Sequence, residues 1–321
     1  MKYLDPNFRS KFERIGHNPL ILLDILKDRL FRELYSKEIS KFIAALKKAN
    51  SHYTLVKPIN LNKLCCIEDW DDPEIKVAIN ELSRPGTPDG VHRKMWEWAL
   101  GIVAMNRFGL INQNTVALGI GSGKEPIIFY LANRIKHITA TDLYDGGYWT
   151  EAPKDFPDNP KKYSSFNYRD DALTVMKMDG TNLQFPSNIF DLVFSFSSIE
   201  HFSGNDHLGA IKSMKETERV LRPGGMAIIA TEFIINNVDH KEFFNTGTIY
   251  SGLLDHLSSL KLVEPLDLTI SPRTLDTTMD YFMTAINWNQ QSAEFKSRHP
   301  HILLRRNGML WTSLLLVLRK S

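Results

Sequence analysis

One stretch, Thr115–Arg134 (TVALGIGSGKEPIIFYLANR), constrains the fold of this chain more than any other. It predicts a short apolar strand over Val116–Leu118, then a glycine loop, then an amphipathic helix that starts near Pro126. Glycine on alternate positions lets the backbone turn sharply and lets a ligand approach the main chain closely. Proline suits the first turn of a helix, and the free N–H groups of that turn then point at the ligand. The stretch therefore predicts a nucleotide-binding corner built on Gly119, Gly121 and Gly123.

The spacing of these glycines excludes two kinds of nucleotide. The dinucleotide fingerprint G-x-G-x-x-G needs a third glycine, but that position is Lys124 counted from Gly119 and Pro126 counted from Gly121. No G-K-[ST] sequence closes the turn, so a Walker loop is absent as well. The spacing thus disfavours a nicotinamide oxidoreductase, and the loop by itself leaves the nucleotide open.

Downstream of this stretch, apolar strand patterns alternate with helical ones. This alternation predicts an α/β fold with a doubly wound, Rossmann-like parallel sheet. The strands are expected near Ile138, before Asp179–Gly180, from Phe190, over Met226–Thr231, over 262–269 and over the terminal 312–320, with helices over 206–221 and 251–260. Between the second and third strands, the aromatic-rich piece Gly146–Tyr168 is either a functional lid or a surface excursion packed on its own side chains.

The first part of the chain has a different pattern. Apolar residues recur at helical spacing between Leu20 and Lys48, which predicts helices packed on the main domain or on a second subunit. The Pro- and Gly-rich segment Ser83–Gly90 reads as a linker. We therefore predict a helical N-terminal extension over 1–90 and a main α/β domain over 91–321, which opens with a helix over 91–108. The N-terminal helices make a homodimer one arrangement that the sequence allows.

Composition narrows the list of partners. The chain has 321 residues, of which 43% are hydrophobic and 24% charged, and its net charge of +2 gives no reason to expect nucleic acid. No apolar run approaches the roughly 18 residues that span a bilayer, and the N-terminus lacks the apolar core of a signal peptide. The cysteines, Cys65 and Cys66, are neighbours, which favours a reducing, cytoplasmic setting. The histidines are scattered, so no metal site is expected.

Four sequence pieces together resemble the class I S-adenosylmethionine-dependent methyltransferases. They are ALGIGSG at the first strand, Asp142 after the second strand, Asp179 with Gly180 after the third strand, and FDLVFSFSSIEHF followed by LRPGG. The last pair resembles the small-molecule subgroup that reads IEHF after the fourth strand and L-x-P-G-G before the fifth. The resemblance implies a seven-stranded sheet whose last strand is antiparallel and lies beside the fifth strand.

The resemblance also implies a role for each matching residue. The three glycines would pass under the methionine and ribose portions of the cofactor. Asp142 would bind the ribose diol, and Asp179, next to Gly180, would accept from the adenine amino group. Ser197 and Ser198 would lie beside the cofactor at the end of the fourth strand.

One position departs from the pattern of the family. An acidic residue usually stands two positions before the first glycine, and here that position is Ala117. Glu125 lies at the start of the following helix and could supply the missing negative charge to the cofactor's ammonium group. The alternative is that its carboxylate only stabilises the helix N-terminus, a contribution of about 0.3–1 kcal/mol.

The catalytic candidate is His201, which follows the fourth strand on the side where the substrate should lie. It is expected to act as a general base, although packing or capping of the next helix would also explain it. Glu200 could orient this histidine or bind substrate. Further candidates for the pocket wall are His92, Tyr148, Trp149, Glu232 and Tyr250.

The loop SSIEHF lacks the N-P-P-Y type amine signature, which argues against nucleic-acid adenine and glutamine as methyl acceptors. We therefore predict methyl transfer to a small polar acceptor, such as a hydroxyl of a sugar or of a biosynthetic intermediate. The alternative is a non-catalytic S-adenosylmethionine-binding protein with a regulatory or scaffold role.

Overall fold

The structure is a computed structural model. It describes residues 19–85, 87–145, 151–164, 166–202, 207–281, 288 and 291–321, and within the first helix it describes side chains at Leu30 and from Leu34 onward. Its helices are α2 (Pro19–Ala49), α3 (Pro73–Leu82), α4 (Arg93–Arg107), α5 (Pro126–Ala132), α6 (Leu208–Val220), α7 (Thr248–Ser251), α8 (Pro272–Asp276) and α10 (Ala293–Arg298).

The strands join into one sheet, whose main path runs in the order β4-β3-β2-β5-β6-β11-β10-β9. The strands on this path are β4 (Leu173–Lys177), β3 (His137–Asp142), β2 (Val116–Ile120), β5 (Phe190–Phe196), β6 (Leu221–Ile234), β11 (Met309–Lys320), β10 (Leu304–Arg306) and β9 (Met279–Asp280). Strands β4 through β6 are all parallel. The predicted doubly wound parallel sheet is therefore confirmed, and the carboxyl ends of five strands meet at one edge.

The last strand, β11, runs antiparallel to β6, with Ser313 opposite Glu232. Its other side pairs in succession with three short strands: β10, β1 (Lys63–Leu64) and β8 (Leu260–Leu262). With β7 (Phe244–Asn245), the described sheet has 11 strands, so the expected count of seven is not confirmed. The physical reason is the length of β11, because a strand of 12 residues offers more backbone hydrogen-bonding groups than one short neighbour can pair.

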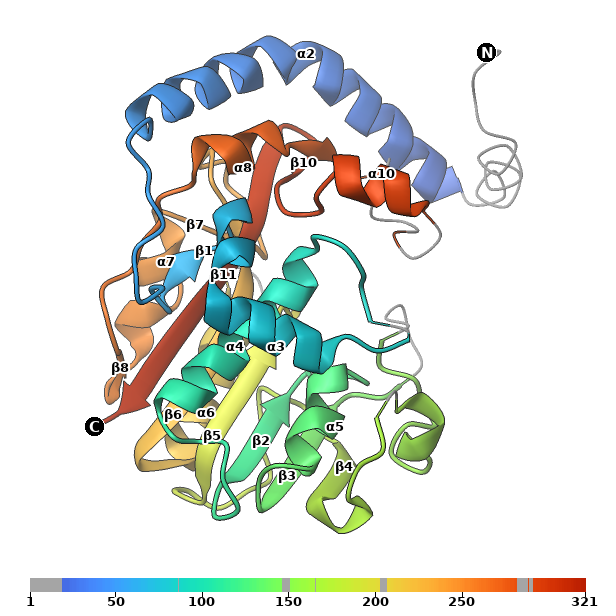
Figure 1. The fold of residues 1–321 in the computed structure, drawn as a ribbon, viewed down its shortest axis with the longest axis vertical. Coiled ribbons are helices and arrows are strands. Elements are labelled where there is room, and N and C mark those ends of the chain that lie inside the picture. The colour runs from blue at the N-terminus through green and yellow to red at the C-terminus, as the bar shows by residue number, and fades with distance from the viewer. Residues whose placement is uncertain are drawn as a thin grey trace.

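Helices cover both faces of the sheet (Figure 1). Buried side chains of α3, α4 and α5 form one core with one face of the central strands. The helix α6 forms a second core with the opposite face. The helix α4 matches the predicted helix over 91–108, and its Gly101 allows close contact, because a Cβ there would lie 2.8 Å from the Phe196 ring.

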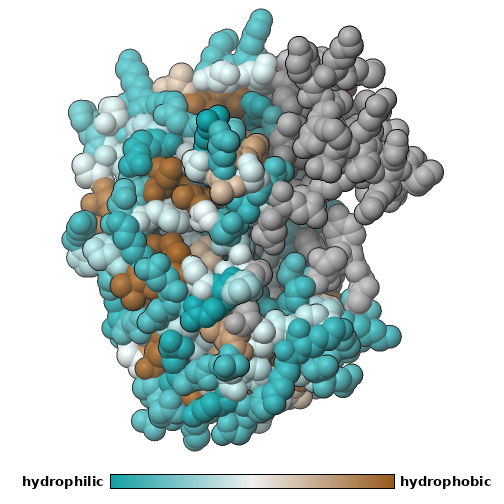
Figure 2. All heavy atoms as spheres, turned by 45° about the vertical axis from the view of Figure 1, so that its right-hand side comes forward, coloured by the Kyte–Doolittle hydropathy of each residue, from teal (hydrophilic) through white to brown (hydrophobic). Residues whose placement is uncertain are grey.

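The N-terminal helix α2 arches over the rest of the molecule in Figure 1 and contacts α8, where Lys47 forms an ion pair with Asp276. Side chains on it remain exposed, among them Leu30 and Leu34, at 56% and 60%. Hydrophobic patches on the face shown in Figure 2 are separate and surrounded by hydrophilic side chains. The homodimer through the N-terminal helices and the boundary at residue 90 stay predictions. None of the helices within the described residues is both long and apolar enough to cross a membrane.

Two predicted segments differ from the structure. In place of a helix over 251–260, α7 ends at Ser251, and Gly252 follows so closely that a Cβ there would lie 2.6 Å from the Thr248 carbonyl oxygen. In place of a strand over 262–269, the short β8 pairs with β11.

The described part of Gly146–Tyr168 packs Phe156 against Phe129 of α5 and against Tyr163. Tyr144, which precedes this piece, belongs to the same buried cluster. This packing agrees with the surface excursion that packs on its own side chains.

Candidate active site

The glycine loop lies at the carboxyl edge of the sheet, directly against the loop that follows β5. Gly121 and Gly123 have φ values of +59° and +47°, a region that side chains other than glycine rarely adopt. A Cβ at Gly121 would lie 2.7 Å from the Ser198 Cβ, and one at Gly123 would lie 2.5 Å from the Glu151 carbonyl oxygen. The Ser198 hydroxyl donates to the Gly121 carbonyl at 2.6 Å. Glycine is therefore required at both positions by backbone conformation and by close approach.

Asp142 ends β3 and faces this loop. Its carboxylate accepts hydrogen bonds from the Gly123 N–H at 3.0 Å and from the Leu143 N–H at 2.7 Å. Burial raises the pKa of this carboxyl group, while the two N–H donors oppose the shift. Each carboxylate oxygen keeps a free acceptor site, so Asp142 suits a ligand with hydroxyl donors.

The remaining residues predicted to bind cofactor lie along the same edge. Asp179 is exposed after β4, and one of its carboxylate oxygens accepts from the N–H and the hydroxyl of Thr181, both at 2.8 Å. A Cβ at Gly180 would lie 2.6 Å from both Ile120 and Phe202. Ser197, with a φ of +53°, turns the chain at the end of β5, where its N–H donates to the Ala230 carbonyl.

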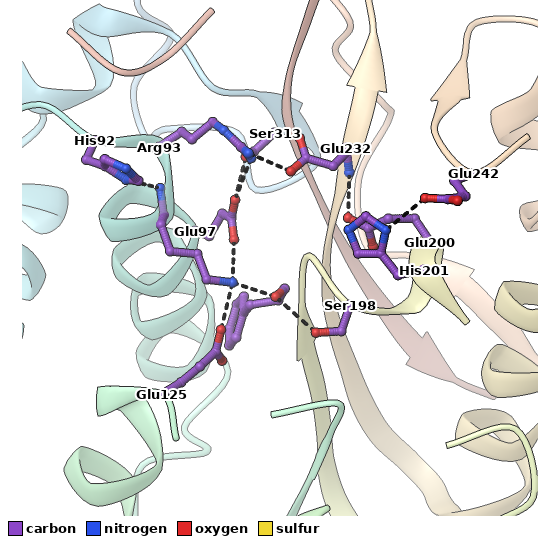
Figure 3. Close-up of polar contacts among 12 residues, drawn as sticks. His92, Arg93, Glu97, Glu125, Ser198, Glu200, His201, Glu232, Glu242 and Ser313 are labelled. Atoms are coloured by element: carbon purple, nitrogen blue, oxygen red, sulfur yellow. Dashed lines mark hydrogen bonds and ion pairs between the residues drawn. The ribbon is translucent and has the colours of Figure 1, made fainter. Parts of the chain in front are cut away.

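Sequence reasoning did not foresee the buried charges at the start of α4, which Figure 3 shows. Lys94 donates to the Phe196 carbonyl at 2.6 Å and lies 2.7 Å from the Glu125 carboxylate and 3.2 Å from Glu97. Arg93 lies 2.6 Å from Glu232 and 3.3 Å from Glu97.

These charges occupy the carboxyl edge of the sheet beside the glycine loop. We call Arg93, Lys94, Glu97, Glu125, Glu200 and Glu232 the ion-pair cluster. Only the i,i+4 spacing of Arg93 and Glu97 and the i,i+3 spacing of Lys94 and Glu97 could have indicated part of this cluster from the sequence.

Burial governs the pKa values in this cluster. It raises the pKa of Glu125 to about 7, although Lys94 holds the value down. It also raises the pKa values of Glu200 and Glu232 to about 7. At Glu97, which is completely buried, Lys94 and Arg93 outweigh the effect of burial and lower the pKa. Three carboxyl groups in one site are therefore close to taking up protons at neutral pH.

Glu125 therefore lies in an ion pair that links α5 to α4. Its side chain makes no capping hydrogen bond at the N-terminus of α5. One carboxylate oxygen, Oε2, is buried and has no hydrogen-bond partner within the part of the chain that the structure describes. Ala117 is fully buried in the apolar core under α4. The role of Glu125 toward the cofactor's ammonium group stays a prediction.

His201 lies in a single 3₁₀ turn (Ile199–His201) after β5, and its Nδ1 is 3.1 Å from the Glu242 carboxylate. The ring contacts Phe243 edge-on, at 6.0 Å between centroids. Glu200 instead points to β6, where its carboxylate accepts from the Glu232 N–H at 3.1 Å. One partner of His201 in this structure is thus Glu242, which no sequence motif marks and which sequence reasoning missed.

The other residues predicted to line the wall of the substrate pocket do not lie together. His92 caps α4, accepting from the Lys94 N–H at 3.1 Å, and stacks on His301 with 4.1 Å between ring centroids. Tyr250 is exposed on α7. Tyr148 and Trp149 lie outside the described residues.

A surface cavity of about 530 Å³ lies beyond the C-terminal end of α5, away from the glycine loop. It contains none of the predicted site residues, and its lining is Arg84, Asn133, Arg134, Ser164, Phe166 and Asn167. Within the described residues, no three His, Cys, Asp or Glu side chains are arranged to hold a metal ion.

The family described as "Methyltransferase domain" matches residues 118–229, which run from β2 into β6. A search of curated proteins found no match. Among solved structures, a putative sarcosine dimethylglycine methyltransferase from Galdieria sulphuraria is 14% identical, with a TM-score of 0.47 and coverage of 78% of this chain and 99% of that one. The [4+2]-cyclase SpnF is 15% identical, with a TM-score of 0.47 and coverage of 79% and 94%. Phosphoethanolamine N-methyltransferase 2 from Haemonchus contortus, in complex with S-adenosyl-L-methionine, is 16% identical, with a TM-score of 0.45 and coverage of 70% and 53%.

The parallel sheet and the glycine corner agree with the methyltransferase domain matched over residues 118–229. Together these findings support an S-adenosylmethionine-dependent methyltransferase, with S-adenosylmethionine as its cofactor. The enzyme, rather than the non-catalytic binding protein, is the alternative that these findings support. The residues fit this cofactor chemically, because Asp142 offers acceptors for hydroxyl groups and the buried, unpartnered oxygen of Glu125 offers negative charge to a cationic ligand.

Proposed function

We propose that this enzyme methylates a hydroxyl group of a small polar acceptor, such as a sugar or a biosynthetic intermediate. The observation that carries the proposal is the His201–Glu242 pair at the carboxyl edge of the sheet. A hydroxyl is a poor nucleophile until its proton is removed, so a positioned base is most useful for an oxygen acceptor.

The residues that would hold S-adenosylmethionine are those of the glycine loop with Asp142, Asp179, Gly180, Ser197 and Glu125. When bound, the cofactor supplies a methyl group on a cationic sulfur, which is a good leaving group. The protein's own contribution is to align the acceptor and exclude water, effects that together can supply about 7–11 kcal/mol.

His201 would take the proton of the acceptor hydroxyl on Nε2. Glu242 accepts at Nδ1, which fixes the ring orientation and stabilises the imidazolium that forms. The half-buried position of the ring, with 22% of its side chain exposed, leaves it access to an acceptor.

The test measures tritium transfer from methyl-labelled S-adenosylmethionine to a small-molecule metabolite extract. We expect His201→Ala to lower turnover by about 10²–10⁴-fold while the affinity for S-adenosylhomocysteine is kept. The exposed His256 is the matched control, because His256→Ala removes a surface imidazole whose Nε2 contacts the Ser251 carbonyl. Full turnover of His201→Ala at saturating acceptor would show that His201 is not the base.

A further inference from the structure

The ion-pair cluster is unbalanced in charge. Two cations, Arg93 and Lys94, face four carboxylates, so full ionisation leaves an excess of two negative charges in a buried place. Burying charge without a counter-charge is costly, and a protein stabilised only by its core would avoid it. His201 is the other basic side chain that affects Glu232, and it is paired with a further carboxylate, Glu242. The excess therefore points to positive charge that the described part of the chain does not provide.

Two oxygens of this cluster mark where that positive charge is needed. Oε2 of Glu200 and Oε2 of Glu232 are buried and have no hydrogen-bond partner among the described residues. The two residues are only 3% and 5% exposed, respectively. The other oxygen of each is occupied, Glu200 by the Glu232 N–H and Glu232 by Arg93, so both carboxylates are held in place. Figure 3 shows Glu200 beside His201, on the side of the cluster away from Glu125.

The cofactor accounts for only part of the missing charge. S-adenosylmethionine carries a sulfonium, an ammonium and a carboxylate, a net charge of one. Glu125 follows the glycine loop by two residues and has a buried open oxygen, so it is the carboxylate expected to face the cofactor's ammonium group. Glu200 and Glu232 remain, next to the residue that would deprotonate the acceptor.

We propose that the acceptor carries a protonated amine in addition to its reactive hydroxyl, and that Glu200 and Glu232 bind this ammonium group. The inference rests on the proposed function and narrows its substrate class to cationic amino alcohols, amino sugars among them. An ammonium group has three donors, which is enough for both open oxygens. Hydrogen bonds between charged groups in a buried site are also strong enough to select such an acceptor over a neutral one.

Alternatives for these carboxylates are weaker. Burial raises the pKa values of both carboxyl groups to about 7, so protons can relieve the repulsion between them until a cation binds. No described set of three ligands would hold a metal ion there.

The experiment uses one metabolite extract divided in two, with one half treated with acetic anhydride in water at mildly basic pH to acetylate amines and leave hydroxyls free. Each half receives the enzyme and methyl-tritiated S-adenosylmethionine. Activated charcoal then removes the adenine-containing cofactor, which is itself a cation, and the remaining products are passed over a strong cation exchanger at pH 7. We expect labelled product from the untreated half to be retained, and at least about tenfold less label in the acetylated half.

The outcomes separate this inference from the function on which it rests. Label in products that pass through the exchanger, unaffected by acetylation, would overturn the cationic acceptor and leave hydroxyl methylation standing. Retained product whose methyl group lies on nitrogen, seen by NMR, would support the ammonium site and overturn the hydroxyl. No transfer in either half would overturn both.

A variant gives a second readout on the retained acceptor fraction. Glu200→Gln should raise the KM for this fraction about tenfold or more and leave the affinity for S-adenosylhomocysteine unchanged, which also shows that the variant folds. The surface residue Glu294, paired with Arg298, provides the control Glu294→Gln with unchanged KM. An unchanged KM in Glu200→Gln would contradict the proposal.

Discussion

Replacing Lys94 by methionine tests the electrostatics of the site most directly. The substitution keeps the long side chain but removes the cation that lies between Glu97 and Glu125. Breaking a buried ion pair typically costs about 3–5 kcal/mol, because the partner is left as an uncompensated buried charge. Unfolding releases about 2.1 cal/mol/K per residue, or roughly 0.7 kcal/mol/K for a chain of 321 residues. The expected fall in Tm is therefore about 4–7 °C.

The loss should depend on pH in a defined direction. The pKa of Glu125 is raised by burial to about 7 even with Lys94 present, and without that cation it rises further. A carboxyl group whose folded pKa exceeds its unfolded value binds extra protons in the folded state, so its penalty is absent at low pH and grows as pH rises through the folded pKa. At pH 6 the Glu125 carboxyl group is mostly neutral in both the wild type and the variant. Between the pKa of Glu125 in the variant and its lower pKa in the wild type, the destabilisation by Lys94→Met decreases by about 1.4 kcal/mol for each unit that the pH falls.

Thermal and urea unfolding at pH 6 and pH 9 would measure this difference. Lys94→Met should be clearly less stable than the wild type at pH 9 and much closer to it at pH 6. Lys94→Arg should recover part of the loss, and Lys215→Met, on the exposed face of α6, should change little at either pH. An equal loss at both pH values would refute the reasoning, since a purely steric defect carries no titration.

Two further predictions concern the glycine loop and the histidine stack. Gly121→Ala should cost roughly 2–5 kcal/mol in unfolding free energy and abolish binding of S-adenosylhomocysteine, because strain at φ +59° adds to a contact of 2.7 Å with Ser198. Gly109→Ala, at φ +65° with nothing within 4 Å, should cost only the strain, and equal losses in both variants would contradict the close-approach argument. Burial lowers the pKa of His301 to about 3, so this residue should cost the wild type about 1.6 kcal/mol between pH 6.5 and pH 5 as the unfolded chain takes up the proton. His301→Phe should show a flatter pH dependence in urea unfolding, and an unchanged slope would contradict this assignment.

Local signals explain what the sequence could predict. Strands β2, β3, β5 and β6 have apolar runs bounded by glycine, proline or acidic residues, and each lies where its pattern indicates. Gly121 and Gly123 were predictable because a positive φ and a close approach both need glycine. The strand count was not predictable, since β1 and β10 are two- and three-residue segments that become strands by pairing with segments distant in sequence, β11 among them.

The partners of the site residues depend instead on tertiary contact. Lys94 meets Glu125 across 31 positions of sequence, and His201 meets Glu242 across 41. No periodicity links such positions, so a histidine after the fourth strand could be predicted as a base while its orienting carboxylate could not. The same holds for His92, whose stacking partner His301 comes from the far end of the chain.

In the helix α4, the charged residues of the first turn say more about function than the apolar residues that cover the sheet. Toward its C-terminal end it buries Val103, Ala104 and Met105, as a helix that only covers a sheet would do throughout. Its first turn instead places Arg93 and Lys94 against carboxylates of β6 and α5. Apolar residues of similar size would give equal or greater stability at these positions. Along α4, buried apolar residues give way to buried charges where the helix reaches the carboxyl edge of the sheet. Local departures from stable packing are expected at functional sites. The charges at the start of α4 are therefore better explained by the ligands of this edge than by the fold.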